Sequence, residues 1–292
     1  MIIDRHRGKE RLPAYEDYIA DDLGGPNSRV DRFERELYPE IRFHCGDLQT
    51  RRVLDFGCGT GSTTAMLALH CERLVAFDIN EHSVAICTRR LEEHGLLERV
   101  QVLCARNFTE IAKDVGPFDL ILVNAVVEHI PLSIAGLRRK IFVELFDALA
   151  PGGSLFINET PNRFWPVDLH TTGLWWIPWS TPGSPWAYRT AVKAGRHVDN
   201  PSAHSDGPLG LEERGAWGAT FFEIAGYLSG RRFRVVNTLR GHNRHISYGH
   251  RIDSRKRQAF EFLVYHAITR WARIPIVALA PMLSNLVIQK AE

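Results

Sequence analysis

VLDFGCGTG, residues 53–61, is the stretch that decides the fold of this chain. Its first residues have the apolar character of a β-strand, and STTAMLALHC at 62–71 has the pattern of a helix that begins directly after the turn. Gly57, Gly59 and Gly61 permit a tight turn and let the backbone approach a ligand where a Cβ would clash. A strand, a glycine-rich turn and a helix N-terminus in this order predict a site for a nucleotide cofactor.

The glycine spacing and two carboxylates indicate which nucleotide binds there. The dinucleotide fingerprint G-x-G-x-x-G has its third glycine one residue later, where this chain has Ser62. Asp55 would repel a pyrophosphate, whereas it suits a ligand with an ammonium and a sulfonium group, as in S-adenosylmethionine (SAM). Asp78 ends a predicted strand at the distance past the turn, about 20 residues, where a carboxylate accepts hydrogen bonds from ribose hydroxyls. The residues favour SAM, and an NAD-linked oxidoreductase is the competing class.

With these residues in view, the chain resembles the class I SAM-dependent methyltransferases. The resemblance extends to a bacterial branch that acts on small molecules, quinone precursors and cell-surface saccharides. Four blocks carry it in order, namely VLDFGCGTG (53–61), LVAFDIN (74–80), FDLILVNAVVEHIP (118–131) and LAPGGSLFINETPNR (149–163). The family then implies that Asp55 faces the methionine end of the cofactor and that Asp78 binds the ribose.

The adenine contact is the point at which the chain departs from the family. Many relatives have an Asp-Ala pair after the third strand, and this chain has Ala105, Arg106 and Asn107 there. Asn107 or a backbone amide would replace that contact, while Ile79 packs on the adenine or belongs to the core. The predicted cofactor-binding residues are Asp55, Gly57, Cys58, Gly59, Gly61, Asp78, Ile79, Asn107 and Asn124.

Strand and helix patterns alternate from residue 51 onward and predict an α/β fold with a doubly wound sheet. The predicted strands are 52–56, 73–77, 99–104, 119–124 and 153–158. In the family the sheet has seven mostly parallel strands with helices on both faces, and residues 233–239 and 284–290 would form its last, antiparallel pair. A helix capped by Asn80 and ended by Gly95 follows the second strand, and Ile134, Ile141, Leu145 and Leu149 mark another, stopped by Pro151, Gly152 and Gly153.

The chain divides into four predicted parts. Residues 1–50 are a helical segment in which Val30, Phe33, Leu37 and Ile41 share one face, although Pro39 should break or end that helix. Residues 51–158 form the cofactor-binding core, 159–218 a lid insertion after strand 5, and 219–292 the end of the core. The last part has a second insertion between strands 6 and 7, residues 240–283, with an amphipathic helix at 258–272.

Residues 159–218 are rich in tryptophan and proline. Six of the seven tryptophans are in this segment, namely Trp165, Trp175, Trp176, Trp179, Trp186 and Trp217. Three interpretations are open: a small core within the segment, an aromatic wall of a substrate pocket, or contact with a membrane surface. The position after the fifth strand places the segment above the predicted cofactor edge.

The candidate catalytic residues are His129, His170 and Asp168. His129 follows the fourth strand, at the edge that faces the transferred methyl group in the family, and a histidine is a natural base near neutral pH. Asp168 and His170 share a face if their segment is extended, so that the carboxylate would orient the imidazole. The alternative for all three is a structural role in turns and helix starts, which is also the interpretation of Glu128.

A metal site is not expected. His242, His245 and His250 lie in an arginine-rich run at 240–257, but their spacing matches no standard zinc site and no cysteine is near. The run is interpreted as a solvated basic face or as a contact for an anionic substrate group or lipid headgroup, beside the 258–272 helix.

Composition narrows the function further. The chain has 292 residues and a net charge of +2, which gives no reason to expect nucleic acid as a partner. Its first ten residues lack the apolar run of a secretory signal, and no stretch approaches the ~20 apolar residues of a membrane span. Five cysteines without a C-x-x-C pair indicate free thiols in a reducing cytoplasm.

The sequence thus predicts a cytoplasmic enzyme that transfers a methyl group from SAM to an oxygen of a small-molecule, saccharide or lipid-like acceptor. The alternatives are an N- or C-methyltransferase of the same fold, or a SAM-binding protein without catalysis. A weak peripheral contact with a membrane is left open, and the sequence does not define the oligomeric state.

Overall fold

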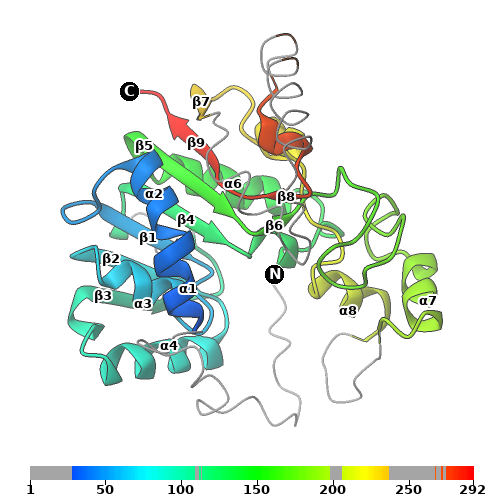
Figure 1. Cartoon of the computed structure of the whole chain (residues 1–292), viewed down its shortest axis with the longest axis horizontal. Coiled ribbons are helices and arrows are strands. Elements are labelled where there is room, and N and C mark those ends of the chain that lie inside the picture. Colours follow the sequence, from blue (N-terminus) through cyan, green and yellow to red (C-terminus); the bar gives the residue numbers. More distant parts are fainter. Residues whose placement is uncertain are drawn as a thin grey trace, which may run out of the picture.

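A seven-stranded sheet with the order β3-β2-β1-β4-β5-β9-β7 forms the centre of the molecule (Figure 1). The computed structural model of the chain describes residues 28–108, 112, 114–197, 206–236, 267, 271 and 274–292. The strands of this sheet are β1 (Arg52–Phe56), β2 (Arg73–Asp78), β3 (Val100–Cys104), β4 (Phe118–Asn124), β5 (Leu149–Asn158), β7 (Phe233–Val236) and β9 (Leu286–Lys290). The predicted doubly wound α/β sheet is confirmed.

Strand direction also matches the prediction. The strands β1 to β5 pair in parallel, and β9 lies antiparallel to both β5 and β7. The chain runs outward from β1 to β2 and β3 and then returns to the other side of β1 to form β4. This reversal makes the carboxyl ends of β1 and β4 the topological switch point, where open α/β sheets bind their ligands.

Helices cover both faces of the sheet because its central strands bury side chains on both sides. Successive residues of β1 divide between two apolar clusters, Val53 toward one face and Leu54 toward the other. One face packs against α1 (Arg29–Glu36), α2 (Tyr38–Cys45), α3 (Ser62–Ala68) and α4 (Glu81–Glu93), and the other against α6 (Leu137–Asp147) and α9 (Phe221–Tyr227). Continuous burial of this kind is typical of parallel strands.

The N-terminal segment forms two helices, because Pro39 separates them as predicted. The first helix, α1, ends before Leu37, and Pro39 occupies the first turn of α2, where a missing N–H costs nothing. The face predicted from helical spacing is buried across both helices, with Val30, Phe33, Leu37 and Ile41 each at most 2% exposed.

The predicted cap of α4 is confirmed, whereas the predicted end of the helix before β5 is not. Asn80 caps α4 through its side chain, and Thr220 forms a capping box with Glu223 at the start of α9. The helix expected between Ile134 and Leu149 is shorter than predicted, because α6 ends at Asp147. Leu149 already pairs with Phe118 of β4, so residues 149–153 begin a strand instead of stopping a helix.

Residues 159–218 form a separate layer beside the sheet. Figure 1 shows their helices α7 (Pro185–Lys193) and α8 (Gly207–Glu213) set apart from the sheet, at the right of the view. Trp217 is fully buried in a small cluster with Ile177, Ala187, Ala191, Leu211 and Ala216. Short elements complete the fold: η2 (Leu97–Arg99), η3 (Val127–His129), η5 (Ile276–Leu279), and a ladder of β6 (Thr160–Pro161) with β8 (Met282–Leu283).

The exposure of the tryptophans in residues 159–218 bears on whether these side chains form a small core, which was one of three interpretations. Only Trp217 belongs to the small core of residues 159–218, whereas Trp175, Trp176 and Trp179 are each more than half exposed and lie ring to ring.

The basic run at 240–257 and all of the predicted 258–272 helix except Ala267 and Trp271 lie outside the described residues. None of the helices in the described ranges has the length and apolar content needed to span a bilayer.

Arg138 of α6 fastens residues 217–218 to the core. Its buried guanidinium donates to the carbonyl oxygens of Ile130, Trp217 and Gly218. Burial lowers the pKa of Arg138 to about 10, which leaves it charged at neutral pH. Glu212 of α8 adds a second fastening, because its Oε1 accepts the backbone N–H groups of Leu132 and Ser133.

We predict that Arg138→Ala lowers the free energy of unfolding by about 2–5 kcal/mol, since three buried carbonyls lose a charged donor. Urea denaturation followed by tryptophan fluorescence measures the change. Arg139→Ala, an exposed neighbour on the same helix, is the control and should change stability by no more than about 0.5 kcal/mol. Equal stabilities of the two variants would show that the Arg138 bonds contribute little.

Candidate functional site

The glycine turn follows β1 at the switch point of the sheet. Gly57, Gly59 and Gly61 all have positive φ angles, of 76°, 53° and 88°. A Cβ on Gly57 would lie 2.5 Å from a methyl group of Val126, and one on Gly61 would lie 2.6 Å from the sulfur of Cys87. A Cβ on Gly59 would meet no atom within 4 Å. Two of these glycines are therefore required by packing, and the third borders open space.

Asp78 ties the end of β2 to this turn. Its Oδ2 accepts the backbone N–H of Gly59 at 2.9 Å, and its Oδ1 accepts the N–H of Asn80 at 2.9 Å. The next residue, Ile79, is 54% exposed although it follows a buried strand. The Asp78 carboxylate thus lies at Gly59 and is followed by an exposed apolar side chain, while contacts of Asp78 with ribose and of Ile79 with adenine stay predictions.

Asp55 lies beneath the turn and is only 1% exposed. Its Oδ2 accepts hydrogen bonds from the hydroxyls of Thr63 at 2.8 Å and Thr64 at 2.7 Å. Burial raises the pKa of Asp55 to about 6, although these two hydrogen bonds oppose the shift. The carboxylate thereby fixes β1 to the start of α3, and its orientation toward the methionine end of a cofactor stays a prediction.

The Cys58 side chain is buried in the core, and a contact of this residue with the cofactor stays a prediction. Its side chain is 4% exposed and lies with Cys87 in an apolar cluster, where that neighbour and burial raise the pKa of the Cys58 thiol. Its N–H donates to Phe77 O, and its carbonyl accepts the N–H of Gly61. Side chain and backbone of Cys58 are thus both used to build the turn.

Asn124 and Asn107 lie at the carboxyl ends of β4 and β3. The Asn158 side chain donates to Asn124 Oδ1 at 2.8 Å, so this pair joins the ends of β4 and β5. Asn107 follows β3 and is half-buried. Contacts of Asn124 and Asn107 with a cofactor stay predictions.

The structure brings His129 and His170 together, although they are 41 positions apart in the chain. His129 ends η3 directly after β4, and His170 comes from the 159–218 segment. Their ring centroids are 5.6 Å apart, and both side chains are exposed. His129 Nδ1 lies 2.8 Å from the carbonyl oxygen of Glu213, which only accepts, so Nδ1 must carry the proton and Nε2 the lone pair. The two candidate bases therefore lie side by side in a single site.

Glu128 belongs to the same cluster and was not expected to. Ligand atoms of Glu128, His129 and His170 all lie within 4.8 Å of one another. Glu128 is fully buried, and within the described part of the chain neither of its carboxylate oxygens has a hydrogen-bond partner. Burial raises the pKa of Glu128 to about 8. The available sequence signal was a glutamate directly before His129 at a strand end.

Gly215 closes the cluster from the side of α8. Its φ is 88°, and a Cβ at this position would lie 2.9 Å from His170 Cδ2 and 3.0 Å from Glu128 Cγ. The backbone of the 159–218 segment therefore packs directly on both side chains. Nothing in the sequence pattern distinguished Gly215 from other glycines of loops.

Asp168 has a structural role in the described structure, and its predicted catalytic role stays a prediction. Its two oxygens accept the backbone N–H groups of His170, Thr171 and Thr172 and the hydroxyl of Thr172. These bonds stabilise the turn at residues 168–172. The Asp168 side chain is 2% exposed. The carboxylate thus shapes the turn that carries His170 and does not orient its ring through a hydrogen bond.

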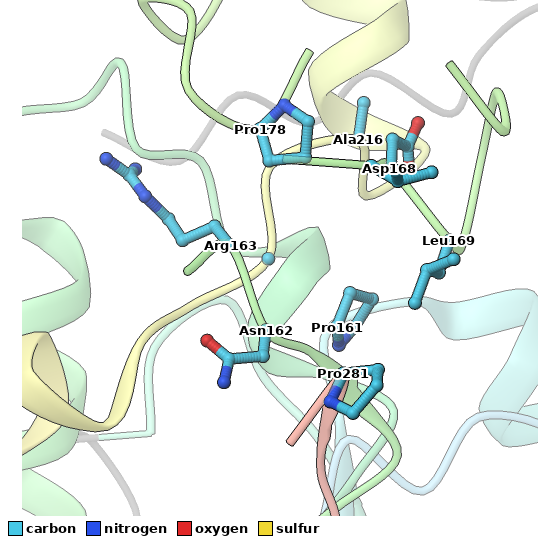
Figure 2. Close-up of a pocket in the computed structure, with 10 residues that line it drawn as sticks. Pro161, Asn162, Arg163, Asp168, Leu169, Pro178, Ala216 and Pro281 are labelled. Atoms are coloured by element: carbon cyan, nitrogen blue, oxygen red, sulfur yellow. The ribbon is translucent and has the colours of Figure 1, made fainter. Parts of the chain in front are cut away.

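A small hollow lies where the 159–218 segment meets the β6–β8 ladder. Figure 2 shows Pro178, Ala216 and Asp168 on one side of it and Pro161 and Pro281 on the other. Leu169, the neighbour of His170 in the chain, also lines it. The hollow is therefore next to the histidine cluster along the chain and is mainly apolar.

Comparisons with known proteins agree with this geometry. Residues 53–153 match the family model of the methyltransferase domain. The chain is 30% identical over 131 residues to a ubiquinone biosynthesis O-methyltransferase of Methylocella silvestris, covering 45% of this chain and 48% of that protein. It is 32% identical over 152 residues to a protein of the same name from Xanthomonas oryzae pv. oryzae, covering 50% and 59%.

A third relative is the human thiol S-methyltransferase TMT1B, 26% identical over 155 residues, with 52% of this chain and 57% of that protein covered. The chain thus spans about half the length of these curated relatives. The matched domain, the strand order and the glycine turn together identify residues 53–153 as part of a class I SAM-dependent methyltransferase domain.

We predict that two glycine substitutions in the turn affect different properties, namely stability for Gly61→Ala and SAM affinity for Gly59→Ala. Gly61→Ala should destabilise the fold by more than about 2 kcal/mol, because it adds a clash with Cys87 to the cost of a positive φ. Gly59→Ala should cost only about 1 kcal/mol, since its Cβ enters open space, but it should weaken SAM binding at least tenfold if that space holds the cofactor. Thermal unfolding and calorimetric titration separate the two effects, and normal SAM affinity in folded Gly59→Ala would contradict the assignment.

Asp55→Asn should make the protein more stable at pH 7. A carboxyl with a raised pKa keeps its proton in the folded state longer than in the unfolded state, so stability falls as pH rises from 3.8 to about 6. The amide keeps an acceptor for Thr63 and Thr64 without this cost, which at ~1.4 kcal/mol per pKa unit amounts to at most about 3 kcal/mol. Urea unfolding of both proteins at pH 4 and pH 7 measures the difference, and parallel pH profiles would contradict it.

Proposed function

We propose that this protein transfers the methyl group of SAM to an oxygen atom of a small-molecule acceptor and releases S-adenosylhomocysteine. The observation that carries the proposal is the match of residues 53–153 to the methyltransferase domain, together with Asp78 beside an open Gly59. The names of the bacterial relatives support an oxygen acceptor. The name of the human relative makes a thiol the alternative acceptor.

The reaction is a direct displacement at the methyl carbon. The acceptor oxygen forms a bond to carbon while the carbon–sulfur electron pair returns to sulfur, which loses its positive charge. Holding the two reactants in line supplies most of the acceleration, so the protein needs a shaped and dry site more than reactive side chains. The sheet edge, the turn after β1 and the 159–218 segment would form that site.

A hydroxyl acceptor must also lose its proton. His129 and His170 are the residues placed to take it, because both stand beside the switch point and His129 presents its Nε2 lone pair. Partial desolvation of the His170 ring, which is still exposed on one side, and the neighbouring His129 lower the pKa of His170, which keeps this imidazole neutral and able to accept a proton near pH 7. General-base assistance of this kind raises rates by about 10²–10⁴.

The 159–218 segment would cover the acceptor. It contributes His170, most of the apolar hollow in Figure 2 and the exposed Trp175, Trp176 and Trp179. These rings suit an aromatic or long apolar acceptor, and their exposure would also serve a weak contact with a membrane surface. A lid that closes over bound cofactor is the corresponding proposal for this segment.

Calorimetry tests the cofactor assignment. SAM or S-adenosylhomocysteine should bind with micromolar affinity, about 8 kcal/mol. Asp78→Ala should weaken binding at least tenfold, because charged hydrogen bonds to the ribose contribute about 1.5–3 kcal/mol. Asp147→Ala, which removes a surface ion pair with Arg231 far from the turn, is the control and should bind normally. Binding of NADH without binding of either SAM species would rule out the proposal.

Turnover is measured as S-adenosylhomocysteine release with a panel of phenols, sugars, thiols and amines of small size. Mass spectrometry of the product then identifies the methylated atom. Methylation of a phenol or alcohol, with amines and thiols inert, is the expected pattern. Methylation of thiols alone would replace the oxygen acceptor by sulfur.

A further inference from the structure

We propose that Glu128, His129 and His170 together bind a divalent transition-metal ion such as Zn²⁺, beside the place where the methyl group is transferred. The ligand atoms of these three residues already lie within 4.8 Å of one another. The sequence treated the two histidines as alternative bases and Glu128 as structural, so this site appears only in the folded chain. Its role in catalysis rests on the proposed function, whereas its existence does not.

The donor set matches one class of metal ion. Two imidazoles and one carboxylate suit Zn²⁺ and similar transition metals, while Mg²⁺ and Ca²⁺ prefer oxygen ligands alone. Catalytic zinc sites have three protein ligands and leave a fourth position for water or substrate. Three ligands with two exposed imidazoles fit that arrangement, because the exposed side leaves room for a further ligand.

The spacing requires only a small adjustment. Two ligands of one tetrahedral zinc ion are roughly 3.4 Å apart when each bond is about 2.1 Å. The present spread of up to 4.8 Å therefore has to shrink by about 1 Å or more in places. His170 lies on an exposed loop and has the freedom to move, whereas Glu128 is fixed by its burial.

The state of Glu128 is an independent observation that points to a cation. A buried carboxylate with few hydrogen bonds is costly, and among the described residues neither Glu128 oxygen has a partner in good hydrogen-bond geometry, although the Thr160 hydroxyl and the Glu128 backbone lie close enough to favour its ionised form. The nearest buried cation, Arg138, already donates to three carbonyl oxygens. Glu159 adds a second negative charge to the surroundings of Glu128 and His170. A metal ion would bind Glu128 in its ionised form and compensate that charge directly.

The environment of His129 is that of a metal ligand. Histidines that bind metals usually donate their second ring N–H to a carbonyl or a carboxylate, which fixes the ring and its tautomer. His129 donates Nδ1–H to the carbonyl oxygen of Glu213, and Gly215 packs on the other two residues. The 159–218 segment therefore supplies one ligand, the support of a second and the wall of the site.

With their lone pairs on the metal, His129 and His170 would not take the proton themselves, and the ion would activate the hydroxyl acceptor in their place. A hydroxyl bound to the open position loses its proton to water more easily because the cation stabilises the resulting oxyanion. The oxyanion then forms the new oxygen–carbon bond as the carbon–sulfur bond breaks. The exposed position of both imidazoles provides the path by which the proton leaves.

Metal binding by the full chain tests the site without reference to activity. Protein stripped with a chelator and dialysed is titrated with Zn²⁺ or Mg²⁺ by calorimetry, and Co²⁺ is added separately to record visible absorption bands. One equivalent of Zn²⁺ should bind, at least tenfold more tightly than Mg²⁺. Glu128→Gln and His170→Gln should each weaken Zn²⁺ binding at least tenfold and alter the Co²⁺ spectrum. His170→Gln changes an exposed side chain, so the test stands even if Glu128→Gln fails to fold.

Two controls use other histidines of the chain. His70→Gln removes a histidine that is paired with a single carboxylate, Glu34, at 2.8 Å, and should leave Zn²⁺ affinity unchanged. Exchange of His242, His245 and His250 for glutamine should also leave it unchanged. Loss of the bound Zn²⁺ only in this triple variant, or equal affinity of His170→Gln and the native protein, would overturn the proposal.

Activity separates this inference from the proposed function. Zn²⁺ binding at Glu128, His129 and His170 without methyl transfer to any acceptor would contradict the proposed function alone. Methyl transfer at full rate by chelator-stripped protein would contradict the role of the metal in catalysis. His170→Gln should still bind SAM with native affinity in either case.

Discussion

The close approach of Gly57 to Val126 is the contact on which the arrangement of the site depends. A side chain on Gly57 would overlap Val126, so the turn after β1 can lie directly against the start of η3. Residues 128 and 129 follow Val126 immediately, and the turn continues to Gly59. One glycine therefore sets the distance between the cofactor turn and the cluster that ends β4. Any larger residue would push these two parts of the switch point apart.

A second close approach completes the cluster from outside the sheet. Gly215 packs on Glu128 and His170, and Arg138 holds the adjoining residues 217–218 to α6 through backbone carbonyls. The 159–218 segment is thus joined to the core at the point where it delivers His170. Its middle part, α7, lies apart from the sheet (Figure 1). The exposed tryptophans of the segment belong to α7, which contains Trp186, and to the residues before it. The segment combines the exposed imidazole of His170 with an apolar outer surface.

Asp55 and Glu128 are two buried carboxyls of the candidate site, and burial makes their ionised forms costly. Both are buried carboxyls whose pKa burial raises, to about 6 and about 8 respectively. Asp55 has two hydroxyl donors in good geometry, while within the described residues Glu128 has only the Thr160 hydroxyl nearby, outside good hydrogen-bond geometry. A buried acid that is left without partners destabilises the folded state unless a proton or a cation accompanies it. Such a local cost is typical of sites that do chemistry.

Local patterns in the sequence were sufficient for the fold. The strand at 52–56, the cap at Asn80 and the buried face of Val30, Phe33 and Leu37 depend on spacing between neighbours in the chain, which the structure keeps. The exception was Leu149, where pairing with Phe118, a residue 31 positions earlier, overrode the helical pattern. The glycine turn and Asp78 were also predictable, since both lie on consecutive strands whose carboxyl ends must meet at one edge.

The sequence by itself determined the alternation of strands and helices and the kind of cofactor turn, because these follow from periodicity and from fixed short spacings, while the family resemblance implied the seven-stranded sheet with its antiparallel last pair. Only the tertiary structure decided what the side chains of Cys58, Asp168 and Glu128 do. Cys58 was turned into the core and Asp168 into its own loop, since burial and hydrogen bonding of a side chain depend on what packs against it. Contact between Glu128 and His170 required a segment whose path is set by distant anchors, which no local pattern records.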